Sequence, residues 1–153
     1  PRSTLFPYTT LFRSINADIE QERGAALEFV RNALGQSFLR RIKQIEEITR
    51  GRERDELVRF LHLLLIWFRD ALVLREGGEI VNSDHRNDLE SFCSRFPDAD
   101  HHGALGEVEG AIRLIDQYVN PTIVLLQLSI RIRKHAVPGD VSTDGTKFAE
   151  AER

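Results

Sequence analysis

The stretch LVRFLHLLLIWFRDALVL, residues 57–74, decides the fold class. Its apolar side chains would occupy most of the circumference of a helix, and the polar interruptions are Arg59, His62, Arg69 and Asp70. A helix that is apolar nearly all round must be covered on several sides, unlike a surface helix with one apolar stripe. A second such stretch, TIVLLQLSIRI at residues 122–132, lies near the C-terminus. We expect another protein to supply part of the cover for these two helices.

Helical spacing continues through almost all of the chain from Ile15 onward, and no stretch alternates in the way that strands and hairpins require. The sequence therefore predicts an all-α protein, a single bundle of about five to six helices. The expected helices lie near residues 17–34, 38–51, 53–75, 89–96, 103–119 and 121–134.

Local signals mark several of the predicted helix ends. Ser37 can cap the second helix, and Gly77-Gly78 tolerates the left-handed exit of the central one. Asn120 can accept the first free backbone N–H groups of the last helix, and Pro121 suits its first position, where a missing donor costs nothing. In that last helix, Leu125 and Leu128 belong to the apolar surface, which can serve packing or contact with another subunit.

Composition narrows the classes of partner and compartment. The formal net charge is -3, from 21 basic and 24 acidic residues, so the chain as a whole has no electrostatic reason to bind nucleic acid or a membrane. The single cysteine excludes an internal disulfide and suits a reducing, cytoplasmic setting. No uncharged apolar run approaches the ~20 residues that cross a bilayer.

The two ends of the chain differ from its middle. Residues 1–14, PRSTLFPYTTLFRS, have no helical period and resemble a translated sequencing adapter, and the chain has no methionine. We expect residues 1–14 to be an artefactual leader outside the fold, and the chain to be a fragment. Residues 15–136 should form the helical domain. Residues 137–153 are rich in small and polar residues, so we expect a disordered tail.

The chemistry of an active site is missing from the sequence. Neither the phosphate-binding loop G-x-x-x-x-G-K-[ST] nor the dinucleotide turn G-x-G-x-x-G occurs, so no cofactor is expected. The one cluster with metal-ligand chemistry is Asp98, Asp100, His101 and His102, whose spacing does not converge on an ion. A solvated loop with helix-capping aspartates is the better interpretation, and we expect no metal and no catalytic residue.

Isolated reactive or basic residues have structural interpretations. Cys93 should pack as a small apolar residue, and His62 should be a core or interface histidine. Acidic residues interleave with Arg50, Arg52 and Arg54, and no aromatic platform for nucleic-acid bases accompanies them. The basic residues from Arg131 onward complement the helix dipole, an interpretation that we favour over a rim facing an acidic partner or phosphate.

The charged side chains of Arg69 and Asp70 must either find a partner or reach solvent. Two charges inside an apolar helix are costly unless they are paired. They could point together toward a neighbouring helix end or a partner subunit, or the pair could reach solvent at one edge of the bundle. An ion pair of this kind adds little net stability but can fix the register between packed helices.

Three pieces of sequence carry a family resemblance: Trp67-Phe68-Arg69-Asp70, the turn Asn82-Ser83-Asp84, and Asn120-Pro121 followed by a leucine-rich helix. In their order and separation they resemble the C-terminal helical domain of bacterial DNA polymerase III clamp-loader subunits. Delta-prime is the nearest match and gamma/tau its relative. The resemblance spans roughly residues 17–134.

The resemblance implies a collar domain that packs against sister subunits to hold a five-membered ring. The parent complex loads the sliding clamp on primed DNA, so this fragment would meet DNA only indirectly and would not be an enzyme. Trp67, Arg69, Asp70 and the last helix are the expected contact or packing residues. The alternative is a freestanding α-helical regulatory or ligand-binding bundle, in which a dimer or an internal cavity absorbs the excess apolar surface.

Overall fold

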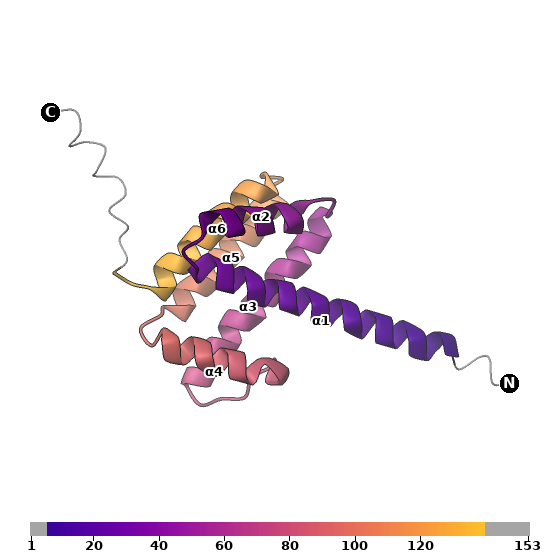
Figure 1. The fold of residues 1–153 in the computed structure, drawn as a ribbon, viewed down its shortest axis with the longest axis horizontal. Coiled ribbons are helices and arrows are strands. Elements are labelled where there is room, and N and C mark those ends of the chain that lie inside the picture. Colours follow the sequence, from indigo (N-terminus) through magenta and orange to yellow (C-terminus); the bar gives the residue numbers. More distant parts are fainter. Residues whose placement is uncertain (1–5, 140–153) are drawn as a thin grey trace.

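The computed structural model describes residues 6–139, which form six α-helices and one short 3-10 helix (Figure 1). The described residues contain no strand, so the predicted all-α class is confirmed. Within the same residues no helix has both the length and the apolar composition that a membrane span requires. The elements are α1 (Phe6–Leu34), α2 (Phe38–Thr49), α3 (Arg54–Arg75), η1 (Ser83–His85), α4 (Arg86–Arg95), α5 (His101–Asp116) and α6 (Pro121–Ala136).

The first helix begins earlier than the sequence pattern indicated. We expected it to start near Ala17, but α1 begins at Phe6, and its N-terminal part extends away from the bundle (Figure 1). Pro7 lies in the first turn, where its missing N–H is not needed, and neither glycine nor proline follows before Gly24. Nothing therefore stops the helix in this stretch. That residues 1–14 do not belong to the domain stays a prediction.

The central helix α3 forms the middle of the core. Helices α1, α4 and α5 all pack against it, and its large apolar residues, such as Phe60, Leu64 and Phe68, are fully buried. The Phe60 ring meets Phe29 of α1 edge to face, with 5.8 Å between ring centroids, an arrangement that aromatic pairs prefer. The chain's own helices thus cover most of α3, and the side chains that remain exposed on its middle part are Arg59, His62 and Arg69.

The helix ends follow their local sequence signals. The Ser37 hydroxyl accepts a hydrogen bond from the Arg40 amide at the start of α2. Gly77 adopts a left-handed φ of 75° after α3, which only glycine adopts without cost. Helix α4 ends at Arg95, just before Pro97. The expected tail falls mostly on residues 140–153, which lie outside the described residues.

Candidate assembly surface

Asp70 is an anchor for the loop that follows α3. Its carboxylate is 0% exposed and accepts hydrogen bonds from the backbone amides of Val81 (2.9 Å) and Asn82 (2.7 Å). Arg69 lies 3.6 Å from the same carboxylate, but its side chain is 53% exposed. The two charges are therefore paired as expected, although they point in different directions. Asp70 fixes the course of the chain into η1, and Arg69 remains available to a neighbour.

Trp67 lies under α4 rather than on the surface. Its ring is buried, with 6.3 Å between its centroid and that of Phe92. No acceptor within the described part of the chain reaches its indole Nε1. Within this chain, Trp67 contributes to packing.

The Asn120-Pro121 pair begins α6 in the manner expected from the sequence. The Asn120 side-chain oxygen accepts from the amides of Thr122 (3.0 Å) and Ile123 (3.3 Å), and Pro121 is the first helical residue. Leu125 and Leu128 are buried against the rest of the bundle. These two leucines therefore face the chain's own core.

The outward side of α6 carries apolar residues that the chain leaves uncovered. Ile123 is 61% exposed and Ile130 is 51% exposed, seven residues apart on the side opposite the buried positions of α6. Sequence reasoning missed these two isoleucines, although the two-turn spacing was visible. It missed them because the apolar residues of α6 do not form a single stripe that marks which side is inside.

Helix α2 lies antiparallel to α6 and adds apolar side chains to this surface. Thr49 Oγ1 lies 3.3 Å from Thr122 Oγ1 at one end of the pair. At the other end Arg133 donates to the carbonyls of Leu34 (3.1 Å) and Gly35 (2.9 Å), just before α2. The first turn of α2 exposes two large apolar residues. We define the α2–α6 face by its four exposed apolar residues, Phe38, Leu39, Ile123 and Ile130.

The basic end of α6 is held within the chain. Arg131 bonds Glu107 at 2.8 Å, and the ring nitrogens of His135 lie 3.1 Å from Asp100 and 3.3 Å from Glu107. Burial alone would raise the pKa of Glu107, but the bonds from Arg131 and His135 outweigh it, so that pKa lies below its usual value. Most of this cluster joins α6 to α5 and to the end of α1, which engages its charges within the chain, and the helix-dipole interpretation stays a prediction.

The cluster near residue 100 is a helix start rather than a metal site. The Asp100 carboxylate accepts the Gly103 amide at 2.8 Å, and this backbone bond is the main reason that the Asp100 pKa lies below its usual value. A Cβ at Gly103 would clash with Asp100 and His135. No group of His, Cys, Asp and Glu side chains in residues 15–139 is arranged to hold a metal ion.

The two histidines next to Asp100 differ from the solvated loop that we expected. Because Asp100 caps α5, the helix includes both, and helical geometry directs His101 inward and His102 outward. His101 is 2% exposed, and its ring centroid lies 5.5 Å from that of Phe92. Burial, helped by nearby Arg75, lowers the pKa of His101 to about 4. The prediction for His101 was wrong because a loop was assumed where a capped helix begins.

The protein should therefore lose stability in mild acid through His101. Since the unfolded side chain titrates near its ordinary pKa of about 6.5, the unfolded state takes up this proton first. The contribution of neutral His101 to the free energy of unfolding is fully present above pH ~6.5, and the free energy falls by about 3 kcal/mol as the pH decreases to ~4. Urea unfolding between these pH values measures the free energy of unfolding of the wild type and of His101→Phe. Subtracting one from the other removes the contribution of the other histidines. Parallel curves for the two proteins would contradict this prediction.

His62 and Cys93 differ in their exposure to solvent. His62 is exposed on α3, so of the two expected places the core was wrong, and the interface stays a prediction. Cys93 is half-buried, and its thiol lies 3.7 Å from the carbonyl oxygen of Ala71. Burial raises the pKa of the Cys93 thiol, which disfavours the reactive thiolate.

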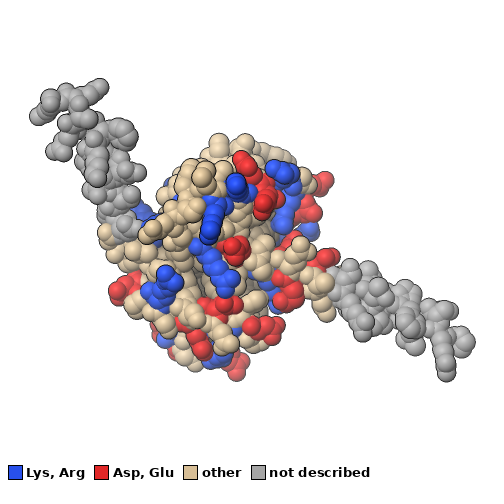
Figure 2. All heavy atoms as spheres, in the orientation of Figure 1, with Lys and Arg blue, Asp and Glu red and all other residues tan. Residues whose placement is uncertain are grey.

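The arginine turn before α3 does have an aromatic neighbour. The Arg54 guanidinium lies 4.5 Å from the ring centroid of Tyr118, which is exposed between α5 and α6 with a φ of 60°. Sequence reasoning missed this contact because the two residues are far apart in the chain. Acidic and basic side chains nevertheless alternate over the visible face (Figure 2), so no single-sign patch for nucleic acid forms there.

Comparison with known proteins gives one match. A family model described as DNA polymerase III, delta subunit, C terminal matches residues 22–134. No curated protein and no solved structure matches the chain. The matched range covers the bundle from the middle of α1 to the last turns of α6.

Proposed function

The chain belongs to the family formed by the C-terminal domains of DNA polymerase III delta subunits, and from this premise we propose that it is the collar domain of a clamp-loader protein of the delta-prime type. Domains of this family are non-catalytic parts of the clamp loader, so the resemblance drawn from the sequence is confirmed at the level of the family. The delta-prime assignment rests on Trp67-Phe68-Arg69-Asp70 and on Asn120-Pro121 with the helix that follows. The proposed role is to hold sister subunits together in a ring.

The α2–α6 face is the observation that carries the proposal. It places four large apolar residues on two packed helices, a rigid support that does not need to be ordered on binding. The contacts at the two ends of the helix pair put Ile123 near one end and Phe38 and Leu39 near the other, so the exposed apolar residues are spread along the whole face. Large exposed apolar surfaces mark protein interfaces. Sister clamp-loader subunits are the partners that the family offers.

A ring of different subunits needs a second contact surface on each member, because each one has two different neighbours. The exposed edge of α3, formed by Arg59, His62 and Arg69, is our candidate. Helices α1 and α5 each contact both α3 and α6, so this edge belongs to another side of the bundle than the α2–α6 face. Arg69 would then contact a neighbour while Asp70 holds the loop beneath it.

The assembly prediction is that Ile123→Asp/Ile130→Asp weakens binding to purified sister clamp-loader subunits by at least about tenfold, since each buried charge opposes the apolar contact. Sedimentation velocity measures the complex, and circular dichroism verifies folding. The matched control is Ile15→Asp/Ile19→Asp, which changes two exposed isoleucines of α1 outside the α2–α6 face. Arg69→Ala in the same assay tests the α3 edge and should weaken assembly more than folding.

Two results would overturn the collar proposal. One is a folded double variant that binds the sister subunits as tightly as the wild type and the control variant do. The other is a chain that binds no sister subunit and instead forms a concentration-dependent dimer through the α2–α6 face. The second result would support the alternative of a freestanding dimeric bundle.

A further inference from the structure

A groove lies between α1 and α4, with α3 at its base, on a part of the surface that the assembly proposal does not use. Its volume is about 340 Å³, within the range of ligand sites in proteins. Helix α4 packs on α3, and side chains rather than close helix packing join it to α1. The apolar residues that line the groove are Leu27, Val30, Leu34, Trp67, Phe92 and Phe96.

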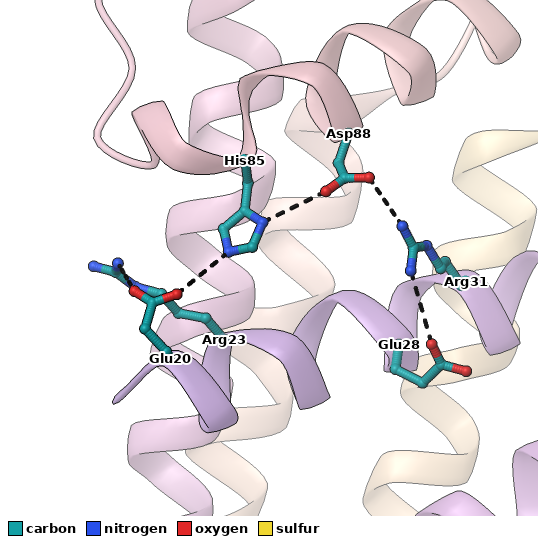
Figure 3. A network of polar contacts seen from close by, with 6 residues as sticks. All are labelled: Glu20, Arg23, Glu28, Arg31, His85 and Asp88. Carbon is teal, nitrogen blue, oxygen red and sulfur yellow. Dashed lines mark hydrogen bonds and ion pairs between the residues drawn. The ribbon is translucent and has the colours of Figure 1, made fainter. Parts of the chain in front are cut away.

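Ion pairs hold one edge of this groove in place. Arg31 of α1 lies 2.9 Å from Asp88 of α4, and His85 of η1 lies between Asp88 (3.5 Å) and Glu20 (4.0 Å) (Figure 3). Arg23 and Glu28 extend the network along α1 (Figure 3). Side-chain contacts on the surface thus join the two helices along this edge, and the groove is open in the chain without a partner.

The charges at the rim select the chemistry of the occupant. Asp88 is already paired with Arg31, whereas Arg95 is exposed and has no acidic partner among the described residues. The unmatched charge at the groove is therefore one cation above an aromatic and aliphatic floor. A carboxylate can bind a guanidinium with two parallel hydrogen bonds, and apolar side chains can fill the space beneath it.

We propose that this groove binds a short peptide segment of a partner protein that carries acidic residues next to large apolar ones. A carboxylate of the peptide bonds Arg95, and its apolar side chains lie against Trp67, Phe92 and Phe96. Nucleic acid fits the groove less well, because Asp88 and the apolar floor offer nothing to a phosphate backbone. This site serves a partner other than the ring neighbours.

Trp67 is the single tryptophan of the chain, so its fluorescence reports on the groove. The probe is a pool of acetylated, amidated tetrapeptides with two glutamates followed by two residues drawn from Leu, Ile and Phe. We expect a saturable change in Trp67 emission below about 1 mM peptide, the range of weak peptide binding. Arg95→Ala should weaken binding about tenfold, the value of one charge-assisted contact.

The matched control is Arg86→Ala, which removes another exposed arginine of α4 that pairs with Glu90 at 2.9 Å. It should bind the pool as the wild type does. The proposal is overturned if the pool leaves Trp67 emission unchanged, if a pool with lysines in place of glutamates or an oligonucleotide binds equally well, or if both arginine variants weaken binding alike. The titration uses the chain without sister subunits, so its failure is separable from failure of the collar proposal.

Discussion

Asp70→Ala is expected to reduce the free energy of unfolding by about 3–4 kcal/mol, because it leaves two backbone donors without an acceptor. Asp70 is fully buried and accepts the amides of Val81 and Asn82 at the entry to η1. Asn82 is itself buried, so water cannot easily replace the lost oxygen for its amide. Urea unfolding at neutral pH, followed by circular dichroism, measures the loss.

Two further variants separate the acceptor role of Asp70 from general loop sensitivity. Asp70→Asn keeps one side-chain oxygen and should lose about half as much. Asp84→Ala changes an exposed carboxylate in η1 and should stay within about 0.5 kcal/mol of the wild type. A loss below about 1 kcal/mol for Asp70→Ala, or an equal loss for Asp84→Ala, would show that the carboxylate does not anchor the loop.

Helix positions were readable from the sequence because their signals are local. The central helix was expected near residues 53–75 and is Arg54–Arg75 in the structure, where Glu53 and Glu56 form a capping box. Asn120-Pro121 marked the start of α6 because both residues act on backbone groups within three positions. Such signals need no knowledge of the other helices. The start of α1 was placed too late because residues 1–14 have no helical period, and only the lack of glycine and proline between Pro7 and Gly24 allows the helix to include part of them.

The direction in which a side chain points was readable only in part, because it depends on which helices become neighbours. His62 lies in an apolar run but is exposed, whereas His101 follows two aspartates and is buried. The partner of Asp70 is a loop backbone 11 and 12 residues away, which no side-chain pattern encodes. The Arg54 contact with Tyr118 likewise arises only when α3 and the α5–α6 turn meet.

The candidate contact surface was also predicted only in part, because its location depends on which helices become neighbours. The excess of apolar residues predicted that cover was needed, but α1, α4 and α5 supply it for α3. Part of the exposed apolar remainder lies on α6 and at the start of α2. Which of the two apolar helices keeps exposed surface depends on the packing order of the bundle, and α3 lies in its middle while α6 lies on its outside.

Trp67→Ala is expected to lower the free energy of unfolding by about 3–5 kcal/mol, because it leaves a cavity under α4 that the surrounding helices cannot close. The Trp67 ring is buried against Phe92, whose ring also contacts Phe68, Phe96 and His101, so the loss would spread through a connected aromatic cluster.

Trp67→Phe is the informative control for Trp67→Ala. The indole Nε1 bonds no acceptor in the described part of the chain, so replacing it removes no hydrogen bond, and most of the packing surface is kept. This variant should lose less than about 1.5 kcal/mol. Guanidinium unfolding followed by circular dichroism compares the two variants, since fluorescence is lost with the tryptophan. Equal losses would mean that the indole nitrogen has a partner, whereas a negligible loss for Trp67→Ala would mean that α4 does not depend on this ring.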